Sequence, residues 1–549
     1  MPHPVALRVA VAPRTNTWHR AACAIVALSM AACSSVMPGA DYPRPVSVAL
    51  VHPRTTTHLG ERFALEAAEH GGRSGFRIIS DGVDAFLIRA QMIDAAQRTL
   101  DLQYFIFRGD QTGRLLIDAL RRAANRGVRV RVLVDDGDTV AGDGRILALD
   151  GRPNLQVRVF NPFAYRGHST MLRALEFMAN ASRLDYRMHN KLMVSDDSIA
   201  LVGGRNIGNQ YFQMDPSSQL ADDDVFAVGP VVKRLSATFD EYWNSRFAIP
   251  ARALGTTRHR SDRHTLRQWR SRQHRQMRSL AAPGLDYVAR VASGEPYAGL
   301  ISGRLPLVWA YSEVVCDSPD KRRVRSRERV GQLMQPEVAA VAAMVSSELL
   351  MITPYVVPAP EEMKLLATLR RRGVTIRILT NSLSTARGLL AQSGYMHYRV
   401  PLLREGVHLY EIRARLGSSK GSGQTERISR FGNYSLHAKQ FVFDRRAVFY
   451  GSMNFDRRSR DLNTEIGVII DSPVLAAQTA ARFAAMAAPQ NAYTVRLRPA
   501  TAGASGPRHL VWDTVEHGIP VEYATEPVHT PGKRLAVKWL SLLHFDGEL

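Results

Sequence analysis

One sparse pattern occurs twice in this chain, and it constrains the fold more than any other feature. MHNKLMVSDDSIALVGGRN occupies residues 188–206, and LHAKQFVFDRRAVFYGSMN occupies residues 436–454. His, Lys, Asp, Gly and Asn stand at the same offsets in both, and the two His residues, 189 and 437, are 248 positions apart. A repeat of this length indicates a duplicated domain rather than a short-period solenoid. Duplicated domains can pair about a pseudo-two-fold axis, which would bring both copies into one site.

The elements expected before each copy repeat in the same order. Strands are expected at 99–107, 128–136, 348–357 and 374–382, and helices at 113–127 and 361–373. Strand–helix–strand order predicts parallel sheets covered by helices. The expected fold is therefore α/β, with two similar α/β/α domains, each a mixed sheet flanked by helices, and the site at their interface.

Each copy of the pattern is expected to fold back as an antiparallel hairpin, turning near 197–198 in the first and near 445–446 in the second. His and Lys, two residues apart, then share one face of a strand. The expected facing pairs are His189 and Asn206, His437 and Asn454, Lys191 and Gly204, and Lys439 and Ser452. The hairpins thus predict two His/Lys/Asn clusters, with one added hydroxyl in the second.

The Asp of each copy has a different predicted role. Asp196 and Asp444 lie near the expected turns, away from the His/Lys/Asn clusters. We therefore expect these two carboxylates to have a structural function, such as holding the turn.

Two such clusters brought together suit phosphodiester chemistry. One His can attack phosphorus as a nucleophile while the other protonates the departing alkoxide. The Lys and Asn side chains can stabilise negative charge on the non-bridging oxygens without a metal. A lone His or Lys on a strand is usually structural, but two copies, each completed by GGRN or GSMN, are improbable by chance.

A nucleophilic His also needs a hydrogen-bond acceptor on its other nitrogen. Glu465, in LNTEIGVII, is the expected acceptor for His437. Asp224, in ADDDVFAVG, is the expected acceptor for His189, because the apolar strand patterns align when Glu465 is matched to Asp224. Its close competitors are Asp222 and Asp223.

The paired patterns resemble the HxKxxxxD motifs of the phospholipase D superfamily over most of the chain, from about Phe76 to Ile470. DLQYFIF, RGVRVRVLVDD, GGRNIG and ITPYVVP are similar to bacterial cardiolipin synthases, especially the C-type branch. The resemblance implies that the His of one half forms a covalent phosphohistidine, while the other His acts first as acid and then as base. The catalytic residues it carries over are His189, Lys191, Asn206, His437, Lys439, Ser452 and Asn454, with Glu465 and Asp224 orienting the two His. No metal or cofactor is expected.

The function that this resemblance implies is transfer of a phosphatidyl group onto the alcohol of a second lipid, such as phosphatidylglycerol. The alternatives are phospholipase D hydrolysis to phosphatidic acid and, less favoured, cleavage of nucleic acid. A net charge of +22, from 72 Lys and Arg against 50 Asp and Glu, fits any anionic partner. Predicted export and the lack of a recognised nucleic-acid module favour phospholipids and a membrane surface as partners over nucleic acid.

The N-terminus predicts export. Arg8, Arg14 and Arg20 precede the apolar run AACAIVALSMAA, whose 12 residues are fewer than the about 20 that span a bilayer. MAAC resembles a bacterial lipobox, which would make Cys33 the lipidated first residue, although Met30 replaces the usual Leu. We therefore expect an exported, membrane-anchored lipoprotein facing the periplasm, in the inner or the outer membrane. Cys316 would be the only other cysteine after cleavage, so no internal disulfide is expected.

The expected segments are a signal peptide at 1–33, an N-terminal linker at 34–75, a first domain at 76–250, a basic linker at 251–290, a second domain at 291–475 and a C-terminal tail at 476–549. The basic linker is either a solvated helix or a surface for lipid or phosphate. The end of the tail, PGKRLAVKWLSLLHFDGEL, mixes basic and apolar residues. It is expected either in a membrane interface or packed as a terminal helix.

Overall fold

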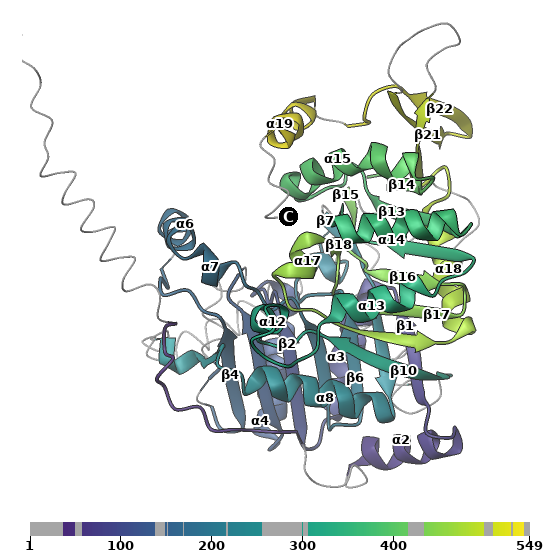
Figure 1. Cartoon of the computed structure of the whole chain (residues 1–549). Helices are drawn as coiled ribbons and strands as arrows, with labels where there is room; N and C mark the ends of the chain where they lie inside the picture. Colours follow the sequence, from purple (N-terminus) through teal and green to yellow (C-terminus); the bar gives the residue numbers. More distant parts are fainter. Residues whose placement is uncertain are drawn as a thin grey trace, which may run out of the picture.

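The structure is a computed structural model. It describes residues 37–49, 57–137, 149–150, 152–167, 169–215, 218–254, 299, 306–414, 433–498, 509–528 and 531–542. The predicted signal peptide, with Cys33, and the predicted basic linker beyond residue 254 lie outside these residues. Figure 1 shows the two halves stacked against each other, each built on a sheet with helices packed on it.

The first half contains a mixed sheet in the order β1–β8–β6–β5–β2–β3–β4–β9. The strands β2, β3 and β4 are parallel, as the strand–helix–strand pattern predicts, and the remaining pairs are antiparallel. The bounds are β1 (Ser74–Ile79), β2 (Thr99–Tyr104), β3 (Arg129–Asp135), β4 (Leu155–Phe160), β5 (Lys191–Ser195), β6 (Ile199–Gly203), β8 (Asp224–Val228) and β9 (Ala248–Pro250).

The second half repeats this order as β10–β19–β17–β16–β11–β13–β14–β20. A hairpin, β21–β22, extends it beyond β20. The bounds are β10 (Val308–Cys316), β11 (Glu348–Ile352), β13 (Thr375–Asn381), β14 (His408–Ile412), β16 (Gln440–Phe443), β17 (Ala447–Gly451), β19 (Ile466–Asp471), β20 (Ala492–Arg498), β21 (His509–Glu516) and β22 (Ile519–Tyr523). The shared strand order confirms the predicted duplication.

The two sheets join edge to edge through the equivalent strands β1 and β10, which are antiparallel with Gly75 opposite Trp309. Such pairing of equivalent edges is what a pseudo-two-fold axis produces. A second link is the parallel pair β7 (Ser218–Ala221) and β15 (Asn433–Leu436), one strand from each half. Within the second half, β12 (Val356–Val357) pairs with β18 (Phe455–Asp456).

Helices cover the sheets, and one hydrophobic core joins the halves. The bounds are α2 (His58–Glu69), α3 (Gly82–Ala95), α4 (Gln111–Asn125), α6 (Thr170–Ala179), α7 (Ala181–Leu184), α8 (Pro230–Trp243), α12 (Lys321–Arg325), α13 (Met334–Ala343), α14 (Pro360–Arg371), α15 (Leu389–Arg404), α17 (Arg457–Asp461), α18 (Pro473–Met486) and α19 (Pro531–Ser541). Phe239 and Trp243 of α8 belong to the same buried cluster as Leu475 and Phe483 of α18. Because this core contains side chains of both halves, the halves stabilise each other's position.

Two predicted boundaries differ from the structure. The boundary at 475 falls inside α18, and β20 pairs with β14, so the second domain extends well into the predicted C-terminal tail. The predicted N-terminal linker contains the helix α2, capped by the Thr57 hydroxyl on Gly60 N. Among the described residues, no helix is long and apolar enough to cross a bilayer.

Candidate active site

Each copy of the pattern forms an antiparallel hairpin as predicted, but its register is shifted by one residue. Ser195 pairs with Ile199 and Phe443 pairs with Ala447, which leaves a three-residue turn in each hairpin. In the first copy, Asp196 and Asp197 take left-handed φ angles of 52° and 51°, and Ser198 N donates to the Ser195 carbonyl at 3.0 Å. The expected two-residue turn was wrong because Ser198 adds a third residue before the pairing resumes. The pairing of Leu192 with Val202 consequently places Lys191 opposite Gly203 rather than Gly204.

The Asp of each turn bonds to the backbone of a neighbouring strand. The Asp196 carboxylate accepts hydrogen bonds from the backbone N–H groups of Gln97, Arg98 and Thr99, at 2.8–2.9 Å. The Asp444 carboxylate accepts from the N–H groups of residues 346, 347 and 348, at 2.7–2.9 Å. Each Asp thus fixes its hairpin to the start of the strand beside it, which is β2 in the first half and β11 in the second.

The His of each copy is bonded to a carboxylate of the opposite half. Nδ1 of His189 lies 2.8 Å and 3.0 Å from the two carboxylate oxygens of Glu465. Nδ1 of His437 lies 2.5 Å from Oδ2 of Asp222. The predicted pairing, Glu465 with His437 and an Asp with His189 within one half, was therefore wrong.

The register of the sheets explains this exchange. Gly203 pairs with Asp224 in the first half, whereas the equivalent Gly451 pairs with Gly467 in the second. The residue equivalent to Glu465 is therefore two positions before Asp224, which is Asp222. The predicted alignment of the two strands was out by two residues.

Three consecutive aspartates consequently have three different functions. Asp222 holds His437, and Asp223 forms an ion pair at 3.0 Å with Arg482 of the second half. Asp224, the predicted catalytic carboxylate, is instead buried between Arg89 and Arg205, at 3.0 Å and 3.2 Å. The contacts of Asp224 with these two arginines stabilise the first half, and Asp224 does not reach either His.

Backbone hydrogen bonds bring the two His residues into one site. The backbone N of His189 donates to the carbonyl of Thr464 at 2.9 Å, and that of His437 donates to Ala221 at 2.7 Å. Each acceptor immediately precedes the carboxylate that holds the same His. Each His is therefore held by the backbone and by a carboxylate of the opposite half.

The ionisation of the two His follows from burial and from the cations around them. Burial, with the nearby Lys191, Lys439 and Arg458 cations, holds the pKa of His189 well below its ordinary value. Burial and Lys439 also lower the pKa of His437 to about 3, against the opposing effect of Asp222. Both rings are therefore neutral, and the carboxylate at Nδ1 favours the tautomer that carries its proton on Nδ1 and its lone pair on Nε2.

The carboxylates and lysines of the site are buried as well. Burial raises the pKa of Glu465 to about 7, although Lys191 opposes the shift. Burial lowers the pKa of Lys439 to about 8 and that of Lys191 well below its ordinary value. An anionic ligand between the two lysines would offset this desolvation, so the site is electrostatically suited to a phosphodiester.

The predicted Asn and Ser residues differ in their partners. Asn206 uses both side-chain atoms within the protein, because Oδ1 accepts from Ile106 N at 3.0 Å and Nδ2 donates to the Tyr211 hydroxyl at 2.9 Å. Asn454 Oδ1 is buried with no hydrogen-bond partner in the described ranges. The Ser452 hydroxyl donates to Glu465, and so supports the carboxylate that holds His189.

Two aromatic residues at the site were missed by the sequence analysis. The Phe105 ring lies edge-on to His189, with 5.1 Å between ring centroids, and Tyr211 lies edge-on to His437 at 5.3 Å. Phe105 ends the DLQYF run and Tyr211 follows GGRNIG, so their closeness to the two motifs was the available signal. Each aromatic ring therefore packs against one of the two His rings.

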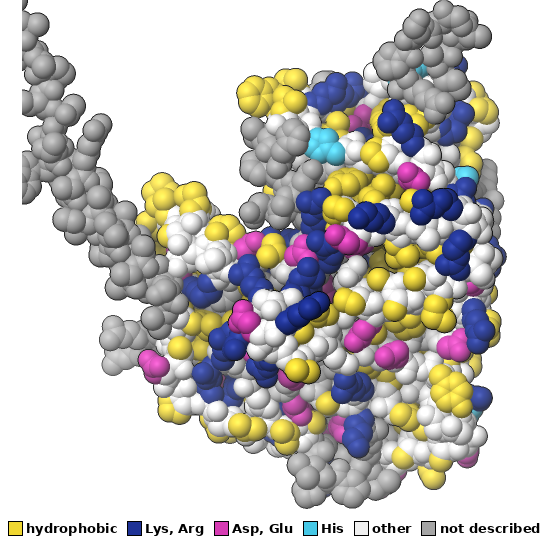
Figure 2. Space-filling view, viewed as in Figure 1, with side chains coloured by type: hydrophobic (Ala, Val, Ile, Leu, Met, Phe, Trp, Pro, Cys, Tyr) yellow, Lys and Arg dark blue, Asp and Glu magenta, His cyan; other side chains and the backbone are white. Residues whose placement is uncertain are grey.

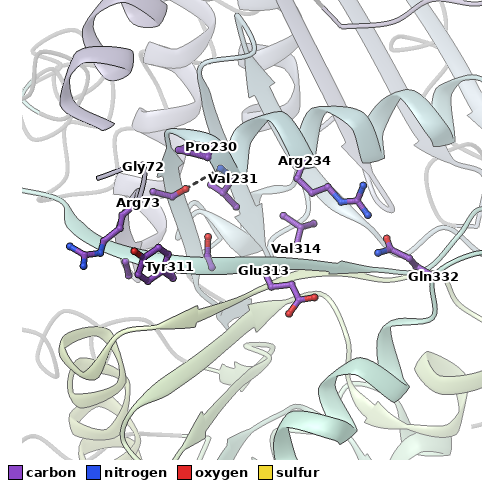
Figure 3. Close-up of a pocket in the computed structure, with 12 residues that line it drawn as sticks. Gly72, Arg73, Pro230, Val231, Arg234, Tyr311, Glu313, Val314 and Gln332 are labelled. Carbon is purple, nitrogen blue, oxygen red and sulfur yellow. Dashed lines mark hydrogen bonds between the residues drawn. The ribbon is translucent and has the colours of Figure 1, made fainter. Parts of the chain in front are cut away.

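A separate hollow of about 300 Å³ lies at the seam between β1 and β10. Figure 3 shows Arg73 and Tyr311 at one end of it, and Arg234 and Gln332 at the other. No residue of the two motifs lines this hollow, so it is distinct from the His site. Within the described ranges, no group of three or more His, Cys, Asp and Glu side chains is arranged to hold a metal ion.

Comparisons with known proteins agree with this geometry. The family model described as "Cardiolipin synthase, PLD-like domain" matches residues 90–243 and 342–487, one segment in each half. The chain belongs to this phospholipase D-like family. Cardiolipin synthase C of Escherichia coli (strain K12) is 36% identical over 422 residues, which cover 76% of this chain and 85% of that protein. The predicted family resemblance is therefore confirmed.

Two further relatives are more distant. An uncharacterized protein of Helicobacter pylori (strain ATCC 700392 / 26695) is 29% identical, with 92% of this chain and 96% of that protein covered. Among solved structures, the phosphatidylserine synthase of Haemophilus influenzae Rd KW20 matches with a TM-score of 0.48 and 12% identity, covering 78% of this chain and 91% of that one.

Proposed function

We propose that this enzyme is a phosphatidyltransferase that makes cardiolipin or a similar lipid by transfer through a phosphohistidine. The observation that carries the proposal is the pair of His residues, each held at Nδ1 by a carboxylate of the opposite half. This arrangement leaves Nε2 of each His to act on phosphorus or on a proton, as a two-step displacement at phosphorus requires.

In the first step, Nε2 of one His attacks the phosphorus of the donor lipid. The bond from phosphorus to the headgroup oxygen breaks, and the other His, protonated once the anionic phosphate is bound, gives its proton to that oxygen. In the second step, this now neutral His takes the proton of the acceptor hydroxyl, whose oxygen attacks phosphorus and breaks the P–N bond. Lys191 and Lys439 stabilise the charge on the non-bridging oxygens in both steps.

The name and similarity of Escherichia coli cardiolipin synthase C support a lipid alcohol as acceptor over water. Hydrolysis to phosphatidic acid uses the same phosphohistidine and remains the alternative outcome. Cleavage of nucleic acid is a further alternative, since the charge of +22 also suits that polyanion.

Lipid product analysis tests these alternatives directly. The purified full chain should convert phosphatidylglycerol into cardiolipin and free glycerol, and a labelled second lipid alcohol should be incorporated into the product. Phosphatidic acid as the main product would establish a hydrolase. Degradation of DNA with no lipid turnover would overturn the proposal.

We further propose that the chain is exported and lipidated on Cys33, so that the enzyme acts at a membrane surface. The apolar run and MAAC support this proposal. Metabolic labelling with a fatty-acid analogue should mark the wild-type chain and not Cys33→Ser. Equal labelling of both would contradict lipidation at this residue.

A further inference from the structure

The helix α6 presents its hydrophobic side chains to solvent. None of its residues is buried, and Met171 and Met178 are 68% and 67% exposed. Leu172, Leu175 and Phe177 are also exposed, at 37–42%. A surface helix ordinarily directs its apolar side toward the core, so this orientation is the reverse of the usual one.

The polar side of α6 is what fixes it to the protein. The Glu176 carboxylate accepts hydrogen bonds from the backbone N–H groups of Ala164 and Tyr165, at 2.6 Å and 2.8 Å. The Arg173 guanidinium lies 3.9 Å from the centroid of the Phe163 ring and 3.7 Å from Asp136. The outward position of the apolar side is therefore built by specific contacts.

The helix α19 has a similar exposed face in the other half. Val537 is buried, and α19 contacts α15, as expected for a packed terminal helix. The opposite side carries Leu535, Trp539 and Leu542, which are 65–71% exposed and spaced by one and two turns. Figure 2 shows hydrophobic patches at the places that α6 and α19 take in Figure 1, and both project from the upper left of the molecule, with Lys and Arg side chains on the adjoining face.

Charge identifies the surface that suits these patches. The sequence of α19, PGKRLAVKWLS, contains three basic residues and no acidic one. Lys533 and Arg534 are half-buried, and their side chains bond to the backbone at Ala386 and Glu526, whereas Lys538 is exposed. Exposed apolar side chains with a Trp and the exposed Lys538, on a chain with a net charge of +22, fit the interface of an anionic bilayer.

The beginning of the described chain lies on the same side as α6. Met37 and Ala164 line one surface hollow, and Ala164 is bonded to α6 through Glu176. Cys33 lies four positions before Met37, and an extended chain over four positions reaches about 14 Å at most. An acyl anchor on Cys33 would therefore hold α6 near the membrane.

We propose that α6 and α19 together form the surface with which this enzyme docks on an anionic lipid bilayer, inserting their exposed apolar side chains at its interface. The proposal rests on the proposed action on lipids, and it adds how the molecule is oriented on the bilayer. Donor and acceptor lipids would then reach the His site from the bilayer on which both helices lie.

Vesicle binding of the full chain tests the surface. The variants Met171→Ser/Leu175→Ser/Met178→Ser and Leu535→Ser/Trp539→Ser/Leu542→Ser should each weaken partition onto phosphatidylglycerol vesicles by about tenfold or more. Both are made with Cys33→Ser, so that an acyl anchor cannot mask the effect. The matched control is Val330→Ser/Val474→Ser/Ile519→Ser, which changes residues that are 53–98% exposed on other elements.

Circular dichroism and thermal unfolding first establish that all variants fold. If the α6 and α19 variants bind vesicles as tightly as the control, the proposal is overturned. It is also overturned if they change only the oligomeric state in light scattering, because the patches would then be an interface between copies of the chain. Lys538→Glu should weaken binding to phosphatidylglycerol vesicles and leave binding to neutral phosphatidylcholine vesicles unchanged.

Activity separates this proposal from the proposed function. The α6 and α19 variants should lose turnover of vesicle-bound phosphatidylglycerol about tenfold and keep turnover of a short-chain lipid dispersed below its micellar concentration. Equal loss on both substrates would contradict a docking role. If the wild type turns over neither substrate, the proposed function fails, while the vesicle-binding result still decides the docking surface.

Discussion

The two halves carry the same hairpin but differ directly after its second strand. The first half has Gly204, and a Cβ placed there would lie 2.2 Å from Oδ1 of Asp222. The second half has Ser452 at the equivalent position, and its hydroxyl donates to Glu465. The backbone at Gly204 thus approaches the Asp222 carboxylate closely, whereas the Glu465 carboxylate accepts a hydrogen bond from Ser452.

The two Asn residues differ in the same sense. Asn206 is occupied by Ile106 and Tyr211, whereas Asn454 keeps a buried oxygen without a partner among the residues described. The two His residues are therefore alike in the carboxylate that each one has at Nδ1. They differ in the residues around that carboxylate and in the partners of the neighbouring Asn. Such asymmetry is what two different duties, nucleophile and acid–base, would require of a duplicated site.

The largest expected effect comes from removing either His. His189→Ala and His437→Ala should each lower kcat at least about 10³-fold, because neither step proceeds without both nitrogens. Assays with the donor lipid would measure this loss. Near-normal turnover in either variant would contradict a shared site. Mapping a trapped phosphohistidine in the wild type would then show which half supplies the nucleophile.

The exchanged carboxylates should give the next largest effect. Glu465→Gln and Asp222→Asn should each lower kcat about 10²- to 10⁴-fold, because the neutral amide no longer fixes the required His tautomer. Their pH profiles should differ. Burial raises the pKa of Glu465 to about 7, so kcat/KM of the wild type should fall as the pH decreases through about 7 and this carboxylate becomes protonated.

Asp222 should not produce that acid limb. Burial favours its neutral form, but His437, Lys439 and Arg205 outweigh burial and keep the pKa of Asp222 below its ordinary value. The acid limb near pH 7 should therefore disappear in Glu465→Gln and persist in Asp222→Asn. An acid limb that persisted in Glu465→Gln and disappeared in Asp222→Asn would contradict these assignments of the two carboxylates.

These carboxylates also mark where sequence reasoning succeeded and where it failed. The fixed offsets of His, Lys and Asp predicted the hairpins and the place of Asp196 at the turn, since these depend on local spacing. The partner of His189 could not be predicted from spacing, because Glu465 comes from the other half. The choice among three adjacent Asp residues depends on strand pairing, because Gly203 lies opposite Asp224 whereas the equivalent Gly451 lies opposite Gly467. Similarly, the apolar pattern of α6 does not reveal which side faces the protein.

A smaller effect should come from exchanging the residues that differ between the halves. Gly204→Ser would force the Asp222 carboxylate away from His437, and a displacement of this kind lowers kcat by about 10²-fold. Ser452→Gly removes one hydrogen bond from Glu465 and should lower kcat only about tenfold. Steady-state kinetics would compare the two. A greater loss in Ser452→Gly would contradict the close approach seen at Gly204.

The smallest effects should be on stability, through the two turn aspartates. Asp196→Asn should lower the free energy of unfolding by about 2 kcal/mol, because three backbone N–H groups lose a charged acceptor in a buried position. Asp444→Asn should cost about 1 kcal/mol, since that side chain is partly exposed and solvent screens its charge. Urea unfolding at pH 7 would measure both, and kcat of the folded enzymes should change little.

The effect of Asp444 should also depend on pH in a defined direction. Burial would raise its pKa, but hydrogen bonds from Glu348, Ser346 and Ser347 hold the pKa of Asp444 well below its ordinary value. A carboxylate with a lowered pKa contributes stability above its unfolded pKa of about 3.9, and this contribution is lost as the pH falls toward the folded value. The difference in unfolding free energy between wild type and Asp444→Asn should thus be constant from pH 7 to about 5 and shrink below about 4. A difference that grew on acidification would show that the carboxylate is not held by these hydrogen bonds.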